Sequence, residues 1–237
     1  MKSISNAELN KAYFDKKMPA STQLKIKNKK CLELASTLIK ENSLKKVLDL
    51  GCADCAFLTG LQKSFPNVSL TGADNSSLVE KKCLSLSLEF KQANFEKELP
   101  FSNNSFDLIS CQQVIEHLQD PEFFVTEISR ILKSNSFLLI STPNLLSLPN
   151  RLRMLFGKYP FFQAPFAKHP FGFHLRLFSL QKLIQLLERN NFVIQKIDSD
   201  FISFDLKHAQ PKIKSVFLGS LMPSYGQRLI LIAKKRN

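Results

Sequence analysis

Short apolar runs separated by polar stretches recur along the first 141 residues. The runs at 47–50, 68–73, 86–90, 106–111 and 136–141 have the length of strands that are buried in a sheet. Segments with apolar residues at helical spacing lie at 22–41, 57–61 and 121–132. This alternation predicts an α/β fold with a mostly parallel sheet and helices on both faces.

The alternation is interrupted after the fifth run. Residues 144–178 interleave seven Phe with Arg and Lys, and their four prolines preclude one long helix, although 145–156 could form a short amphipathic one. A long insertion in a compact fold is usually a lid or a binding loop; the alternative is a small subdomain with its Phe residues packed inward. A helix at 179–190, a strand at 192–197, an irregular stretch at 200–225 and a last strand at 228–233 follow. We expect one domain over 1–237, with an N-terminal helical segment at 1–42 and a cap insertion at about 144–178.

The first strand ends in a glycine turn that opens the next helix. Gly51 follows Val47, Leu48 and Leu50, an apolar run around one acid, and Asp54 is a plausible N-cap for the helix after it. Glycine lets the backbone approach a ligand closely, and the helix N-terminus adds free N–H groups, so this turn is a candidate ligand site. It is not a dinucleotide fingerprint, because Ala53 and Ala56 stand where G-x-G-x-x-G requires glycine.

The second strand ends in Asp74, about 20 residues after the glycine turn. A carboxylate at the end of the second strand of a βαβ unit can accept hydrogen bonds from both hydroxyls of a ribose. The pattern therefore favours a nucleoside-containing ligand.

The turn and a later block together resemble one enzyme family. The segment 49–55, Asp-Leu-Gly-Cys-Ala-Asp-Cys, resembles motif I of the class I S-adenosylmethionine-dependent methyltransferases, (D/E)-x-G-x-G-x-G, with two glycines replaced by Ala53 and Cys55. The segment 98–110, which contains Leu-Pro-Phe and Ser-Phe-Asp-Leu-Ile, resembles the family's later block. The resemblance covers roughly residues 35–200 and implies a Rossmann-like seven-stranded sheet, with S-adenosylmethionine as cofactor.

The resemblance also implies which residues bind the cofactor. Asn94 stands where the family has an acid that binds the adenine amino group, and its side-chain carbonyl can still accept that hydrogen bond. Phe95 could lie against the adenine face or be a core residue at a strand end. The complete implied set is Asp49, Gly51, Ala53, Asp74, Asn75, Asn94, Phe95 and Gln112.

Two histidines are candidate catalytic residues. His117 occupies the family's Glu-His position after the fourth strand, and a purely structural role is the alternative. His174 begins a stretch, 174–179, that resembles a pattern in quinone-biosynthetic O-methyltransferases. A histidine there could take a proton from an acceptor hydroxyl. The implied reaction is in-line methyl transfer to a small or lipid-like acceptor, with O-methylation preferred, and it depends mainly on proximity and alignment.

Charge is unevenly distributed along the chain, whose net charge is +13. Residues 1–142 hold 18 Lys and Arg against 16 Asp and Glu, whereas 143–237 hold 15 against 4. A basic half of this kind can bind an anionic membrane, an acidic substrate or nucleic acid, or it can be only a solvated face. Peripheral contact of 144–178 with an anionic membrane is our expectation. Nucleic-acid methylation ranks lower, because no Asn-Pro-Pro-Tyr motif is present, and a methyltransferase-like module with weak cofactor affinity stays open.

The five cysteines form no even framework, which favours reduced thiols and a cytoplasmic protein. No run approaches the ~20 apolar residues of a membrane span, and residues 1–11 hold no apolar signal core. Cys52-x-x-Cys55 also fits a redox motif, but that reading leaves Asp49 and Asp74 unexplained. Because Cys31, Cys83 and Cys111 are scattered in the sequence, we expect no metal site.

Overall fold

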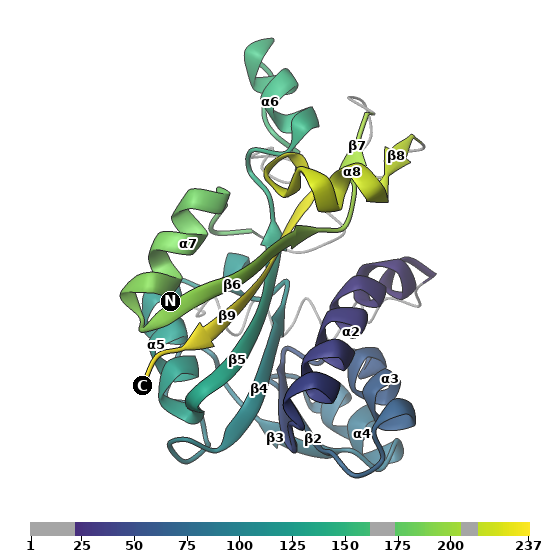
Figure 1. Ribbon diagram of the computed structural model, residues 1–237, viewed down its shortest axis with the longest axis vertical. Helices are drawn as coiled ribbons and strands as arrows, with labels where there is room; N and C mark the ends of the chain where they lie inside the picture. The colour runs from purple at the N-terminus through teal and green to yellow at the C-terminus, as the bar shows by residue number, and fades with distance from the viewer. Residues whose placement is uncertain (1–21, 162–173, 205–212) are drawn as a thin grey trace, which may run out of the picture.

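The computed structural model describes residues 22–161, 174–204 and 213–237 (Figure 1). The first half of the predicted N-terminal segment lies outside the described residues. So do the Phe residues between 162 and 173, and Lys168, in the insertion.

A seven-stranded sheet forms the centre of the molecule, in the order β3-β2-β1-β4-β5-β9-β6. The first five strands pair in parallel, and β9 runs antiparallel to both of its neighbours. This arrangement confirms the predicted fold class. The strands are β1 (Lys46–Leu50), β2 (Ser69–Asp74), β3 (Glu89–Gln92), β4 (Phe106–Gln112), β5 (Leu132–Pro143), β6 (Phe192–Ser199) and β9 (Arg228–Lys235).

Helices cover both faces of the sheet. On one face lie α2, α3 and α4, and on the other lie α5 and α7 (Figure 1). A 3-10 turn, η1, follows β4. Their bounds are α2 (Thr22–Asn42), α3 (Ala56–Ser64), α4 (Ser77–Ser85), η1 (Ile115–His117), α5 (Pro121–Ile131) and α7 (Leu180–Arg189).

Two hydrophobic cores result, one on each side of the sheet. Adjacent residues of β5 face opposite cores because side chains alternate along a strand: Leu138 packs with α5 and α7, and Leu139 packs with α2 and α3. Both side chains are fully buried. The central strands carry apolar residues on both faces for this reason, which is why they appear in the sequence as short, mostly apolar runs.

Capping residues fix where the helices begin. Asp120 accepts a hydrogen bond from the Phe123 N–H, with Pro121 in the first turn, as the sequence indicates. At α3 the expected N-cap is off by one residue. The N-cap is Cys55, whose side chain makes no cap bond, while Asp54 accepts from the Ala56 N–H.

Two further segments differ from the expectations. The third strand, expected within 85–94 and centred on 86–90, is Glu89–Gln92, because α4 ends only at Ser85. Leu88 is buried from the loop between α4 and β3, and this burial explains the apolar run. The stretch 200–225 is not irregular in its described parts. It holds β7 (Ile202–Ser203), β8 (Lys214–Ser215), α8 (Val216–Leu221) and η2 (Pro223–Tyr225).

The insertion after β5 starts and ends at the sheet. Asn144 forms a bridge with Phe178, and the Leu145 N–H donates to the Phe178 carbonyl at 3.0 Å. The Asn144 side chain also donates to two carbonyls, those of Ser224 and Gly226. From this base α6 (Leu148–Leu155) extends, and it lies with α8, β7 and β8 beyond one end of the sheet (Figure 1). Across the described ranges, no helix combines the length and apolarity needed to span a membrane.

Candidate cofactor and acceptor site

The glycine turn after β1 has an unusual backbone. Gly51, Ala53 and Cys55 all have left-handed φ angles, of 78°, 45° and 59°. Only glycine adopts this region at little cost. Ala53 and Cys55 are therefore held in a backbone conformation that is unfavourable for residues with a Cβ. A Cβ at Gly51 would overlap Cγ2 of Val114, which closes the turn from the side of η1.

The Asp74 carboxylate joins this turn to the next one. Its Oδ2 accepts from the Ala53 N–H at 3.3 Å, and its Oδ1 accepts from the Ser76 N–H at 3.0 Å. Asp74 thus stands where β1 and β2 both end, at the carboxyl edge of the parallel strands. In open α/β sheets this edge is where ligands bind.

Asp49 lies beneath the turn and is 3% exposed. Burial, together with the charges of Asp74 and Asp54, raises the pKa of Asp49 to about 8, although a hydrogen bond with Ser110 opposes the rise. Asp49 Oδ1 is fully buried and has no hydrogen-bond partner among the residues that the structure describes. A buried carboxyl oxygen without a hydrogen-bond partner favours a cationic or hydrogen-bonding ligand above it.

The other predicted cofactor residues lie along the same edge. Asn94, after β3, accepts from the Glu96 N–H through its side-chain carbonyl, which keeps a second acceptor position. Phe95 packs on the core with its ring centroid 5.4 Å from that of Phe124, and its edge also approaches Gly51. Both alternatives for Phe95 are thus compatible with its position.

Asn75 and Gln112 stand at the ends of β2 and β4. The Asn75 carbonyl accepts from the Gln92 side chain, and Gln112 donates to Ser110 Oγ at 2.8 Å. The structure therefore brings all eight predicted cofactor residues to one edge of the sheet.

The two candidate histidines face each other. The rings of His117 in η1 and His174 after the insertion have centroids 4.9 Å apart at an interplanar angle of 68°. Together with Glu116 they form a cluster whose ligating atoms all lie within 4.8 Å of one another. Glu116 was not predicted as a site residue, and its signal in the sequence is the Glu-His pair itself.

Backbone contacts hold this arrangement. The N–H groups of Leu175 and Arg176 donate to the Glu116 carbonyl at 2.8 and 3.1 Å, which places His174 against η1. The Glu116 carboxylate is buried and accepts from Thr142 Oγ1 at 3.0 Å. Residues from the ends of β4, β5 and the insertion thus converge on one point.

The cysteines correct two expectations. Cys83 is not isolated, because Cys55 and Cys83 form a disulfide beneath the glycine turn, and Cys52 Sγ lies 3.7 Å from Cys83 Sγ. The chain therefore does not hold five reduced thiols. Within the described ranges, the three sulfurs and the Glu116–His117–His174 cluster are the groups spaced closely enough to hold a metal ion, and the expected absence of metal stays a prediction.

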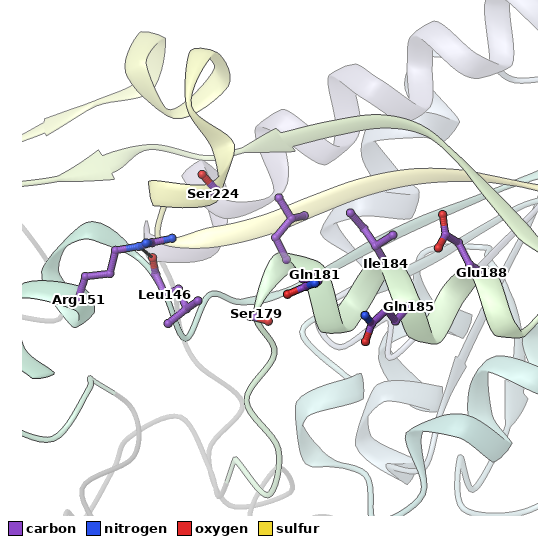
Figure 2. Close-up of a pocket in the computed structure, with 9 residues that line it drawn as sticks. Leu146, Arg151, Ser179, Gln181, Ile184, Gln185, Glu188 and Ser224 are labelled. Atoms are coloured by element: carbon purple, nitrogen blue, oxygen red, sulfur yellow. Dashed lines mark hydrogen bonds between the residues drawn. The ribbon is translucent and has the colours of Figure 1, made fainter.

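A pocket lies at the base of the insertion, beside α7 (Figure 2). Arg151 and Ser224 face it from one side, and Gln181, Ile184 and Glu188 of α7 form the other side. Gly51, Asp74 and the two histidines are not among its lining residues, so it is separate from the edge described above.

Comparison with known proteins places this edge in a family context. A sequence model of the methyltransferase domain matches residues 22–197. The chain is 25% identical over 188 residues, 75% of its length, to the mitochondrial ubiquinone biosynthesis O-methyltransferase of Schizosaccharomyces pombe. It is 24% identical over 163 residues, 65% of its length, to the ubiquinone biosynthesis O-methyltransferase of Pelagibacter ubique. The two alignments cover 66% and 63% of those relatives' own lengths.

The fold has solved counterparts. A SAM-dependent methyltransferase from Thermotoga maritima superposes with a TM-score of 0.61 at 19% identity, over 86% of this chain and 87% of that one. At this identity the likeness concerns the fold, and it agrees with the strand order described above.

Proposed function

Because the chain belongs to the methyltransferase-domain family, we propose that it transfers the methyl group of S-adenosylmethionine to a hydroxyl oxygen of a small or lipid-like acceptor. The names of the two ubiquinone-biosynthesis relatives support an oxygen acceptor, and the paired histidines support removal of its proton. The histidine pair is the observation that carries the choice of acceptor atom.

The edge around Gly51 suits this cofactor. In the proposal, Gly51 and Ala53 contact its amino-acid part, Asp74 binds the ribose, and Asn94 accepts from the adenine amino group. Asp49 supplies a buried carboxyl oxygen without a hydrogen-bond partner in the described part of the chain, below a ligand that carries two positive centres, whose charge would lower the raised pKa of this carboxyl group. When bound, S-adenosylmethionine supplies an electrophilic methyl group on a sulfonium sulfur. The chain's part is to hold the acceptor oxygen in line with it, which can contribute roughly 7–11 kcal/mol.

The histidines would remove the acceptor proton. A hydroxyl is a weak nucleophile until its proton leaves, and histidine is the side chain that exchanges protons most readily near neutral pH. In the proposal His174 takes the proton, because it stands on the segment that closes the insertion. His117 lies against it, and the buried Glu116 stabilises the positive charge that forms on the pair.

The insertion gives the acceptor a route from a membrane surface. Exposed apolar residues gather on α6 and the loop after it, where Leu155 is 76% and Phe156 69% exposed, beside Lys158. Arg151 and Arg153 lie over the rings of Tyr225 and Phe161 and add positive charge to the same segment. Apolar and cationic side chains together are typical of a segment that lies in an anionic membrane interface. We therefore propose peripheral contact through this segment for a lipid-like acceptor.

The experiment measures transfer of labelled methyl from S-adenosylmethionine to a catechol, with the matching aromatic diamine as comparison. We expect label on the catechol only. His174→Gln should lower kcat about 100-fold or more while leaving the Kd of S-adenosylmethionine unchanged. Transfer to the diamine but not to the catechol would contradict the proposed acceptor atom.

An acidified acceptor provides the control for the role of His174. A nitrocatechol is already ionised at neutral pH and needs no base, so His174→Gln should retain most of the wild-type rate with it. An equal loss with both catechols would show that His174 acts in positioning rather than in proton removal.

A further inference from the structure

Three cysteines meet beneath the cofactor turn. Cys52 and Cys55 belong to the turn itself, and Cys83 comes from the end of α4. All three side chains are buried, and their sulfurs lie within 4.8 Å of one another. The methyl-transfer chemistry proposed above uses none of them.

Cys83 has two partners within reach. It is joined to Cys55 in a disulfide, and the Cys52 sulfur lies 3.7 Å from it. Cys52 is fixed there because it packs on Gly72 of β2, where a Cβ would lie 2.8 Å from its sulfur. Burial, followed by the nearby charges of Asp49 and Asp74, raises the pKa of the Cys52 thiol, so it stays protonated and leaves the Cys55–Cys83 bond intact.

The disulfide acts on a strained segment. Cys55 has a left-handed φ of 59°, two residues after Ala53 with its φ of 45°. Neither residue prefers this region, and Cys55 gains no helix-cap bond from its side chain. The covalent link to α4 holds Cys55 in place, so the tether substitutes for the conformational freedom that glycine would supply.

We propose that Cys55, Cys83 and Cys52 form a thiol–disulfide site that controls the cofactor turn, with the Cys55–Cys83 disulfide as the binding-competent state. The inference rests on the proposed function in one respect, namely that this turn binds S-adenosylmethionine. Reduction frees Cys55, the turn relaxes from its left-handed conformation, and cofactor affinity falls.

The chemistry balances with an external dithiol or peroxide. A dithiol breaks the Cys55–Cys83 bond and becomes a disulfide, and each protein sulfur gains one electron and one proton. Hydrogen peroxide reverses the step by accepting two electrons and two protons and forming two waters.

The test compares oxidised and dithiothreitol-treated protein. Alkylation followed by mass spectrometry should count three thiols before reduction and five after it. Calorimetric titration with S-adenosylmethionine should give a Kd about 10-fold or more higher for the reduced form, the size that one strained left-handed residue implies. Five thiols before reduction, a disulfide that dithiothreitol does not open in the folded protein, or equal affinities would each overturn the proposal.

Variants separate the tether from the strain. Cys83→Ser leaves Cys55 untethered and should bind like the reduced wild type under both conditions. Cys55→Gly removes both the tether and the strain, so its two Kd values should agree with each other and be lower than that of Cys83→Ser. Cys31→Ser, a buried thiol of α2 outside the cluster, should keep the redox response. A redox response that persists in Cys83→Ser would overturn the proposal.

Hydrogen exchange of residues 51–56 decides the case without the cofactor. Reduction should speed exchange there and not in β4. If neither form binds S-adenosylmethionine, the proposed function fails, while faster exchange on reduction still supports the redox site and unchanged exchange overturns it.

Discussion

At the scale of single residues, Gly51 offers the sharpest test of the cofactor turn. A Cβ there would overlap Cγ2 of Val114, at a φ of 78°. We expect Gly51→Ala to weaken S-adenosylmethionine binding about 10-fold or more in calorimetric titrations. Gly157→Ala is the matched control, because Gly157 also has a left-handed φ, of 65°, but no described atom lies within 4 Å of its added Cβ. Equal losses in both variants would count against the turn as the binding site.

The raised pKa of Asp49 leads to a second prediction at this scale, which concerns how the free energy of unfolding of the cofactor-free protein depends on pH. Its pKa is raised to about 8 in the folded chain, against about 3.9 for an unfolded one. Between these values the folded state holds a proton that the unfolded state has released. The contribution of Asp49 to stability is therefore lost as pH rises, by about 1.4 kcal/mol per pH unit.

Asp49→Asn removes this titration. In urea unfolding, the variant should gain about 1–3 kcal/mol relative to wild type between pH 5 and pH 7. Glu41→Gln, which removes an exposed carboxylate at the end of α2, should show no such gain. If the difference in unfolding free energy between Asp49→Asn and wild type stayed constant with pH, Asp49 would be ionised in the folded chain.

Site residues could be predicted from sequence where their role follows from local position, and not where it depends on a contact with a residue far away in the chain. Asp49, Gly51 and Asp74 could be predicted because each follows from its place at a strand end. Cys83 could not, because its contact with Cys55 depends on where α4 ends, 28 residues away. Val114 was missed for the same kind of reason, since its approach to Gly51 requires the left-handed Gln113 before it.

At the scale of elements, α6 and the loop after it carry the membrane prediction. We expect the protein to co-sediment with phosphatidylglycerol vesicles and not with phosphatidylcholine vesicles. Arg151→Glu with Arg153→Glu should lower that binding about 10-fold or more, because each cation near the surface contributes about 1 kcal/mol.

The exposed apolar residues of α6 and the loop after it give a second membrane test, with a matched control in α4. Leu155→Ser with Phe156→Ser should also weaken vesicle binding, because both side chains are exposed on the segment. Leu78→Ser with Leu84→Ser removes two exposed apolar side chains from α4 and should leave binding unchanged. If Leu155→Ser with Phe156→Ser still bound vesicles as wild type does, a lid over a soluble acceptor would be the better account of the insertion.

Most helices and strands could be predicted from the spacing of apolar residues, with exceptions that have physical reasons. Central strands such as β4 could be predicted because burial on both faces favours a short, mostly apolar run. The run around Leu88 was read as strand although it is loop, because a buried loop leucine and a strand leucine look alike in sequence. The short β7 and β8 were missed because two-residue strands carry no period.

At the scale of the whole molecule, the two cores share one sheet. We expect Leu138→Ala and Leu139→Ala, which open cavities on opposite faces of β5, each to lower the free energy of unfolding by about 2–5 kcal/mol. Both should shift a single thermal transition, with equal calorimetric and van't Hoff enthalpies. Two transitions, each shifted by one variant only, would contradict the prediction of one domain.

The overall architecture was accessible from sequence because alternating strands and helices leave few other solutions. The meeting of His117 with His174 was not accessible, although both were named as candidates, because it depends on hydrogen bonds from the backbone of residues 175 and 176 to Glu116. Charge imbalance indicated the basic half of the chain, and the exposed apolar residues on α6 needed the fold to become visible.

The base of the insertion has a consequence for how such a protein can diversify. Asn144 and Phe178 are bridged neighbours, so the insertion leaves the sheet and returns to it at one narrow neck. Length and composition can change above that neck without altering the register of β5 against its partners. If the insertion borders the acceptor as proposed, a change in its sequence would change the acceptor, while the sheet edge around Gly51 and Asp74 would stay the same.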